Sequence, residues 1–292
     1  MNENDFWWEI ELSADSNEEL LSIIDISGSI GSSFDSLGNA RAYYINSNPV
    51  EYWIRVIESL LPNFNTVKIL ANRKIEYRSW HKEWKEAFPP LNVGSEFVVL
   101  APWHRGTESS DRIPLFIYPA TAFGTGYHES TQIALALLEV NKYAIQGKEV
   151  ADIGAGSGIL AIAALKLGAS FVYARDIDPT VIDEIRNNIR ENEILDESVE
   201  LITGDLLNGF NSSVDIITAN ILFGPLCSML PDVVRVLSDE GIAIFSGLLV
   251  REREDFLAEA NEAGLILKEE ITQNEWWGAS FFRMFKLNGF IK

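Results

Sequence analysis

The sequence predicts an α/β protein whose mostly parallel sheet is covered by helices on both faces, preceded by a small α+β domain. After Leu91, strand-like and helix-like segments alternate, from "KEVADI" and "GILAIAALKLG" to "GIAIFSGLL" and "REDFLAEANEAG". Such alternation requires crossover connections, which place helices on both faces of a parallel sheet. The last two strand-like segments, "LILKEEIT" and "WWGASFFRMFKL", have no helix between them. We therefore expect an antiparallel hairpin to close the sheet.

The first 77 residues predict a separate small domain. "FWWEIELS" (Phe6–Ser13), "ARAYYIN" and "TVKILANRKI" are strand-like, and apolar residues recur at helical spacing in Asn17–Ile26 and Pro49–Leu61. Glycines punctuate residues 28–38, which we interpret as a loop. The order strand, helix, strand, helix, strand predicts a ferredoxin-like domain.

A linker helix is predicted over residues 78–90. Trp80, Trp84 and Phe88 recur every four positions, which places them on one helical face, and two prolines then end the pattern. We expect these aromatic side chains to pack into a core, with a partner-binding stripe as the alternative. The helix divides the chain into a domain of residues 1–77 and a domain of residues 91–292.

Composition limits the classes of partner. The chain has 292 residues, enough for two domains, and a formal net charge of −20. Such a charge repels nucleic acid and attracts a basic partner, so no direct nucleic-acid binding is expected. The single cysteine, Cys227, excludes an internal disulfide and fits a reducing compartment. The start lacks a basic, then apolar, signal pattern, and no apolar run approaches about 20 residues. We expect a cytoplasmic monomer without membrane contact.

The segment "VADIGAGSGILAIAALKLGA" predicts a ligand-binding turn between a strand and a helix. Its glycines are Gly154, Gly156 and Gly158, whereas a dinucleotide fingerprint would need its third glycine at Ile159. Asp152 ends the strand, where its carboxylate can accept hydrogen bonds from loop N–H groups or act on a cationic ligand through water. It would repel a pyrophosphate. The turn therefore favours a positively charged ligand that approaches the backbone closely.

Acidic residues follow the next two strands. Asp176 ends "FVYARD", 22 positions after Gly154, where a carboxylate can accept both hydroxyls of a ribose. We assign Asp178, two residues later, to the cap of the following helix. Asp205 in "TGDLL" is placed either to read an adenine amino group or to form a turn.

This combination resembles the class I methyltransferases that use S-adenosylmethionine. Three further features make the resemblance more specific: "AFGTGYHESTQ" before the first strand of the sheet, "ANIL" where amide and adenine methyltransferases have an "NPPY"-type tetrad, and a leading α+β unit with a W-x-x-x-W-K helix. Together they resemble the ribosomal-protein methyltransferase family that modifies the eleventh protein of the large subunit. The resemblance covers about residues 6–286 and implies a Rossmann-like, seven-stranded, mostly parallel sheet.

The resemblance also implies a cofactor site for S-adenosylmethionine. In the family, the cofactor contacts lie at positions that correspond here to Thr131, Gly154, Asp176 and Asn220. We also expect cofactor contacts from the surrounding loop and strand ends, at Phe123, Gly124, Thr125, Gly126, Asp152, Gly156 and Asp205. The chain departs from the commonest family pattern at Tyr127 and Glu129 but keeps the glycines of "FGTG" and His128.

The resemblance further implies a basic ribosomal protein as substrate, free rather than RNA-bound, and methylated on lysine side chains and on its terminal α-amine. In the family, a mobile amino-terminal domain recognises that substrate. Asn220 ends a strand, where its side-chain oxygen could orient a neutral amine. Its alternative role is the cap of the helix around Pro225. The three histidines are scattered, and neither a metal site nor a dedicated general base is expected.

Other functions remain open at this point. One is a methyltransferase of the same fold that acts on another protein lysine or a small amine. Another is a non-catalytic module that docks a ribosomal protein. A nicotinamide dehydrogenase is disfavoured by Ile159, and nucleic-acid methylation by the net charge and by "ANIL", which offers no aromatic ring to stack a flipped base.

Overall fold

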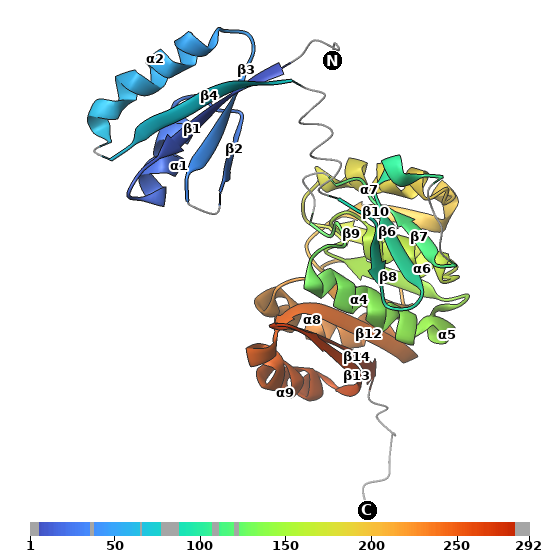
Figure 1. The fold of residues 1–292 in the computed structure, drawn as a ribbon. Helices are drawn as coiled ribbons and strands as arrows, with labels where there is room; N and C mark the ends of the chain where they lie inside the picture. The colour runs from blue at the N-terminus through green and yellow to red at the C-terminus, as the bar shows by residue number, and fades with distance from the viewer. Residues whose placement is uncertain are drawn as a thin grey trace, which may run out of the picture. The chain divides into compact units, whose positions relative to one another are not determined.

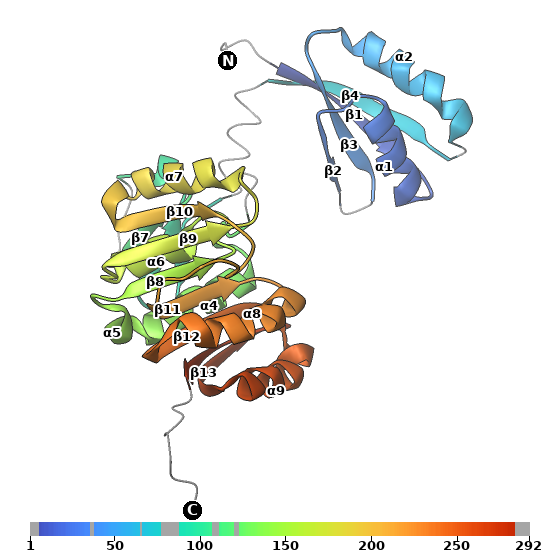
Figure 2. The same ribbon diagram turned by 180° about the vertical axis from the view of Figure 1, so that it is seen from behind.

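The computed structural model describes residues 6–35, 38–64, 66–76, 88–106, 111–119 and 123–283. The chain divides into two compact units, residues 1–87 and 88–292 (Figures 1 and 2). The predicted linker helix falls largely on residues 77–87, outside the described residues. No helix in the described ranges is long and apolar enough to span a membrane.

The first unit is a four-stranded antiparallel sheet with two helices on one face. Its elements are β1 (Phe6–Ser13), α1 (Asn17–Ile26), β2 (Gly31–Phe34), β3 (Ala40–Ile45), α2 (Val50–Leu60), the 3₁₀ turn η1 (Leu61–Asn63) and β4 (Lys68–Glu76). The strand order is β2-β3-β1-β4. Ile10 and Tyr44 from the sheet are buried against Leu20 of α1 and Ile57 of α2. The predicted ferredoxin-like arrangement is confirmed.

One part of that prediction was wrong. Residues Gly31–Phe34, expected to be loop, form β2 at the sheet's edge. All four residues are exposed, so the strand has no alternation of buried apolar and exposed polar residues for sequence reasoning to detect. Backbone pairing with β3, from Gly31 opposite Tyr43 to Phe34 opposite Ala40, forms it instead.

The second unit contains the predicted mostly parallel sheet. Its seven strands are β8 (Glu149–Ile153), β9 (Phe171–Asp176), β10 (Val199–Thr203), β11 (Val214–Asn220), β12 (Leu237–Leu249), β13 (Leu265–Gln273) and β14 (Trp276–Arg283), in the order β10-β9-β8-β11-β12-β14-β13. Neighbours from β10 to β12 are parallel, whereas β14 runs antiparallel to both β12 and β13. The predicted closing hairpin is thereby confirmed.

Helices cover both faces of this sheet (Figures 1 and 2). One face packs on α4 (Glu129–Val140), α6 (Ile159–Lys166) and α7 (Val181–Glu191), and the other on α8 (Phe223–Val236) and α9 (Arg253–Ala263). The short helix α5 (Lys142–Ile145) follows α4, and the 3₁₀ turns are η2 (Pro102–His104), η3 (Asp196–Ser198) and η4 (Val250–Glu252). The two separate apolar layers explain the nearly continuous apolar character of the central strands.

A second, smaller sheet precedes the main one. It contains β5 (Leu91–Val93), β6 (Phe97–Leu100) and β7 (Ile113–Phe116), in that order. The predicted strands "EFVVLAPW" and "IPLFIYPA" correspond to β6 and β7. Their buried side chains, such as Phe97 and Leu115, join the core layer formed by α4, α6 and α7.

Strand order places the ligand-binding edge of the main sheet. The chain moves outward from central β8 to β9 and β10, then crosses back to β11 on the other side of β8. The connections leaving these strands therefore diverge at a topological switch point, where doubly wound sheets bind their ligands.

Candidate functional site

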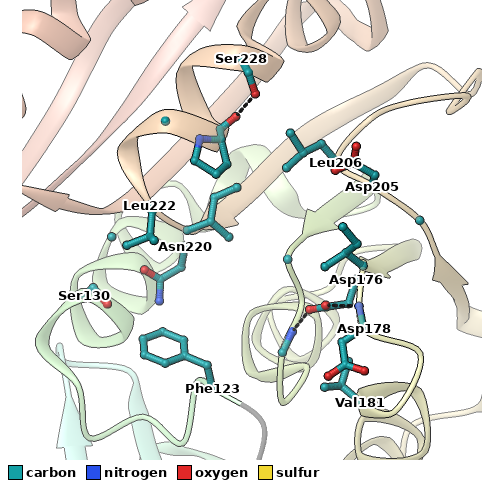
Figure 3. A pocket seen from close by; sticks show the side chains of 18 of the residues that line it. Phe123, Ser130, Asp176, Asp178, Val181, Asp205, Leu206, Asn220, Leu222 and Ser228 are labelled. Carbon is teal, nitrogen blue, oxygen red and sulfur yellow. Dashed lines mark hydrogen bonds between the residues drawn. The ribbon is translucent and has the colours of Figure 1, made fainter.

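A cavity of about 890 Å³ lies at the carboxyl ends of β8, β9, β10 and β11. Figure 3 shows Phe123 and Asn220 on one side of it and Asp176, Asp178 and Val181 on the other. The lining is mostly apolar, with a few polar groups that converge, as in small-molecule sites. Its residues are Phe123, His128, Ser130, Gly154, Gly156, Asp176, Ile177, Asp178, Val181, Gly204, Asp205, Leu206, Asn220, Ile221, Leu222, Gly224, Pro225, Ser228, Gly247 and Trp276.

Two glycines of the glycine-rich turn expose bare backbone to the cavity. Gly154 and Gly156 line the space and have φ angles of 70° and 54°, which L-residues rarely adopt. A Cβ on Gly156 would lie 2.5 Å from the carbonyl oxygen of Phe123, and one on Gly154 would collide with Ile221. The turn therefore needs glycine both for its conformation and for close packing.

Asp176 presents a fixed carboxylate to the cavity. Its Oδ2 accepts a hydrogen bond from the Gly156 N–H at 2.8 Å, and its Oδ1 accepts one from the Asp178 N–H at 3.0 Å. Each oxygen keeps a further lone pair for a ligand. At the end of β9, the carboxylate of Asp176 can therefore accept hydrogen bonds from two hydroxyl groups.

Asp178 does not occupy the N-cap position of the following helix that the sequence predicted for it. Its Oδ1 accepts hydrogen bonds from the backbone N–H and the hydroxyl of Thr180, and these bonds lower the pKa of Asp178. Helix α7 begins at Val181, with Thr180 at the cap position and no side-chain cap. Asp178 thus closes the turn before the helix rather than capping it, and its side chain also reaches the cavity.

Asp152 lies outside the cavity lining. It is fully buried beneath the turn, where Oδ1 accepts a hydrogen bond from the Thr218 hydroxyl at 2.7 Å and Oδ2 accepts one from the Ala161 N–H at 3.1 Å. Burial raises the pKa of Asp152 to about 7. We therefore remove Asp152 from the predicted cofactor contacts: it joins β8 to the first turn of α6.

Asn220 ends β11 with its amide in the cavity lining. Its Nδ2 donates to the Thr131 hydroxyl at 3.2 Å, whereas its buried Oδ1 has no partner among the described residues. Helix α8 begins at Phe223 without a side-chain cap, so Asn220 does not cap it. Thr131 is itself fully buried behind Asn220. Its predicted contact with the cofactor stays a prediction, and its visible role is to hold the amide.

The "FGTG" loop packs on the glycine-rich turn. The Phe123 carbonyl accepts a hydrogen bond from the Ser157 N–H at 2.8 Å, and the Gly124 carbonyl accepts one from the Ser157 hydroxyl at 2.6 Å. Only Phe123 of this loop lines the cavity, while Gly124, Thr125 and Gly126 lie outside the lining. The loop's glycines thus serve packing in this structure, since a Cβ on Gly126 would press on Val99 of β6.

Two aromatic residues outside the predicted cofactor contacts, His128 and Trp276, also line the cavity. The rings of His128 and Trp276 meet edge to face with centroids 4.5 Å apart, and both line the cavity. His128 Nδ1 also accepts a hydrogen bond from the Ser130 N–H and caps α4. Neighbouring side chains on a strand alternate between faces, so Trp276 reaches the cavity while Trp277 is fully buried in the core. The alternation along this strand was the signal by which the sequence could have indicated that one of the two tryptophans lines the cavity.

The cavity is acidic. Asp176, Asp178 and Asp205 line it, and the described residues of the lining include neither lysine nor arginine. This charge favours a cationic ligand and disfavours a pyrophosphate. Among the residues that the structure describes, no group of histidine, cysteine, aspartate or glutamate side chains could hold a metal ion.

Comparison with known proteins identifies the family. Residues 13–283 match the family described as "Ribosomal protein L11 methyltransferase (PrmA)". The chain belongs to this family. A ribosomal protein L11 methyltransferase from Carboxydothermus hydrogenoformans is 35% identical over 81% of this chain and 76% of its own length. One from Caldanaerobacter subterraneus is 37% identical over 73% of this chain and 67% of its own length.

A solved structure supports the same assignment. The crystal structure of a ribosomal protein L11 methylase from Lactobacillus delbrueckii is 29% identical to this chain, with a TM-score of 0.62. It matches 68% of this chain and all of that protein. The predicted family and the class I methyltransferase fold are therefore confirmed.

Proposed function

We propose that the protein transfers methyl groups from S-adenosylmethionine to lysine side chains and to the terminal α-amine of a large-subunit ribosomal protein of the L11 type. Relatives of this chain are named ribosomal protein L11 methyltransferases. The observation that carries the proposal is the placement of two polar side chains in the lining of one acidic cavity: the carboxylate of Asp176 and the amide of Asn220.

The described residues fit S-adenosylmethionine. Asp176 would accept the ribose hydroxyls, Asp205 the adenine amino group, and the bare backbone at Gly154 and Gly156 would allow close approach. When bound, S-adenosylmethionine supplies an electrophilic methyl group on a positively charged sulfur. The acidic lining stabilises that positive charge, whereas it would repel the pyrophosphate of a dinucleotide.

Asn220 is the residue we assign to catalysis. A lysine amine of pKa about 10.4 is only ~0.1% neutral near pH 7.4, which costs roughly 4 kcal/mol. Phe123, Leu222 and Trp276 form an apolar wall of the cavity, and desolvation of the amine against this wall would lower its pKa. The Asn220 Oδ1, held by the bond from Nδ2 to Thr131, would accept a hydrogen bond from the neutral amine and aim its lone pair.

The proposal also covers whether the substrate is free or bound to RNA, which domain recognises it, and where the enzyme acts. The net charge of −20 suits a basic substrate and repels RNA, which supports methylation of the free ribosomal protein. We further propose that residues 1–77 recognise that protein, that 78–90 form a linker, and that the enzyme acts as a cytoplasmic monomer.

Mass spectrometry tests the proposal. The protein is incubated with S-adenosylmethionine and purified L11, alone and within ribosomes, and L11 is then mapped by peptide mass. We expect additions of 14 Da per methyl on lysines and on the terminal amine of free L11. Unmodified L11 beside a methylated protein of another kind would favour a different substrate. Binding of L11 without any transfer would favour a docking module.

A further inference from the structure

The loop from 204 to 210, between β10 and β11, brings Asp205 and Leu206 into the cavity lining without a helix to hold it. Leu206 has a φ of 44°, in the left-handed region. A non-glycine residue there costs about 1–3 kcal/mol and persists only where its surroundings fix it. Leu207 and Phe210 anchor the loop in the core, and the Gly204 N–H donates to the Asp176 carbonyl at 2.8 Å. Side chains from other elements add further contacts.

Two arginines from different elements bind the carbonyl groups of this loop. Arg175 of β9 donates from Nη2 to the Asn208 carbonyl. Arg235 of α8 donates from Nη1 to the Phe210 carbonyl at 2.9 Å and from Nη2 to the Leu207 carbonyl at 3.4 Å. The loop is thus anchored both to the sheet and to the helix that covers it.

Arg175 is the more unusual of the two. Its side chain is 7% exposed, and its Nε has no hydrogen-bond partner among the described residues. The guanidinium lies against Gly204, where an added Cβ would collide with it. Burying a partly satisfied cation is unfavourable, so fold stability alone does not account for an arginine here. Its hydrogen bond to the 204–210 loop gives the buried arginine a role in placing that loop.

A short chain of hydrogen bonds leads from Arg175 to the cavity. Arg175 holds the Asn208 carbonyl, and the Asn208 Nδ2 donates to Asp205 Oδ2 at 2.9 Å. The Asn208 N–H also donates to the Asp205 carbonyl at 3.0 Å. One carboxylate oxygen of Asp205 is thereby held, and the other stays available to a ligand.

We propose that Arg175 is a positioning residue that fixes the 204–210 loop, so that Asp205 accepts a hydrogen bond from the adenine amino group of S-adenosylmethionine. The inference rests on the proposed function and adds to it a residue outside the cavity that sets cofactor affinity. Arg175 acts only through the loop, because it does not line the cavity.

A double-mutant cycle on the full chain tests this. Calorimetry measures the Kd of S-adenosylmethionine for the wild type, R175M, D205A and the double variant, since methionine keeps much of the arginine stem. We expect R175M to weaken binding about tenfold and to add little further loss in the D205A background. The KM for S-adenosylmethionine should rise with kcat nearly unchanged. R186M, which removes a surface arginine paired with Asp183, is the control and should bind normally.

Equal losses in both backgrounds, or an unchanged Kd for R175M, would overturn the inference while leaving the proposed function intact. If R175M does not fold, R175K takes its place in the cycle, because lysine keeps a buried cation but loses the guanidinium fork. N208A tests the next link separately, because it keeps the carbonyl that Arg175 binds and removes only the side-chain bond to Asp205. Its loss of affinity should also vanish in the D205A background. A wild-type protein that binds no S-adenosylmethionine would instead refute the proposed function, and the inference with it.

Discussion

At the scale of single residues, the unpartnered Oδ1 of Asn220 is the feature closest to the chemistry. Buried acceptors without a donor are uncommon, and they cost stability unless something completes them. Because Thr131 holds the other end of the amide, Asn220 cannot turn away from the cavity without losing its bond. A substrate donor that enters the cavity beside Asn220 would complete this acceptor.

Replacement of Asn220 by alanine should lower kcat about a hundredfold, because the amine loses the group that orients it. The free energy of unfolding should fall by only about 1–2 kcal/mol, the cost of leaving the Thr131 hydroxyl unpaired. Methylation kinetics and chemical denaturation measure the two effects separately. An Asn220→Ala variant with the wild-type kcat would exclude Asn220 from the reaction.

Asp176→Ala should weaken S-adenosylmethionine binding by at least tenfold, since the variant loses both ribose contacts. Asp176→Asn is a matched control of similar size that keeps oxygen acceptance at one position, so an intermediate affinity is expected. Calorimetry gives both values. Undiminished affinity in the alanine variant would contradict the ribose assignment.

Asp152 predicts a pH dependence of stability. Its folded pKa of about 7 lies above the usual 3.8, so the folded state binds the proton more tightly than the unfolded state. Its contribution is fully present below about pH 4 and is lost as pH rises through 7, a change of about 4 kcal/mol. Asp152→Asn should flatten this slope, because asparagine can still bond Thr218 and Ala161. Urea unfolding between pH 4 and 8 measures it, and a slope identical to the wild type would refute the account.

Much of the site was predictable from residue types at strand ends. Asp176, Asp205, Asn220 and Gly154 follow successive strands of a parallel sheet, and the structure brings them to one cavity. Asp152 misled sequence reasoning because a strand's last side chains alternate between the cavity and the core, and the sequence does not say which residue faces which.

At the scale of elements, the glycine-rich turn and the "FGTG" loop form one packed unit. Contacts between Gly124 and Ser157 and between Phe123 and Gly156 join segments about 30 residues apart. Sequence reasoning placed both segments at the cofactor but could not show that most of the loop packs behind the turn. That arrangement depends on long-range packing, which local patterns do not encode.

Gly156→Ala should displace the Phe123 loop and lower both stability and cofactor affinity. The added Cβ meets a backbone oxygen at 2.5 Å, and alanine is strained at a φ of 54°, so the cost should be about 1–3 kcal/mol or more. Gly147→Ala is the control, because its φ is 73°, no atom lies within 4 Å of the new Cβ, and it lies outside the cavity lining. Thermal unfolding with and without S-adenosylmethionine compares them. Equal effects of the two variants would show that backbone strain alone accounts for the loss.

At the scale of the whole molecule, each unit has its own apolar core. This supports the proposal that one unit recognises the substrate and the other binds the cofactor. Ile10, Leu20 and Ile57 belong to the core of the first unit, while the layers on both faces of the main sheet belong to the second. The fold class was predictable because strand and helix periodicity repeats over many elements. The edge strand β2 escaped prediction because only backbone pairing holds it.

A protein of residues 88–292 should therefore bind S-adenosylmethionine with near wild-type affinity yet methylate L11 far more slowly, by about a hundredfold or more in kcat/KM, because it lacks the proposed recognition domain. Calorimetry and a methylation assay test the two halves of this expectation. A truncated protein that methylates L11 as efficiently as the full chain would remove substrate recognition from residues 1–77.

The central claim is that the cavity at the ends of β8, β9 and β11 binds a positively charged sulfur nucleoside. Titration of the full chain with S-adenosylmethionine, and separately with a nicotinamide dinucleotide, tests it most directly. The account predicts saturable one-site binding of S-adenosylmethionine, weakened in Asp176→Ala, and no measurable heat with the dinucleotide. Binding of the dinucleotide in place of S-adenosylmethionine would contradict it.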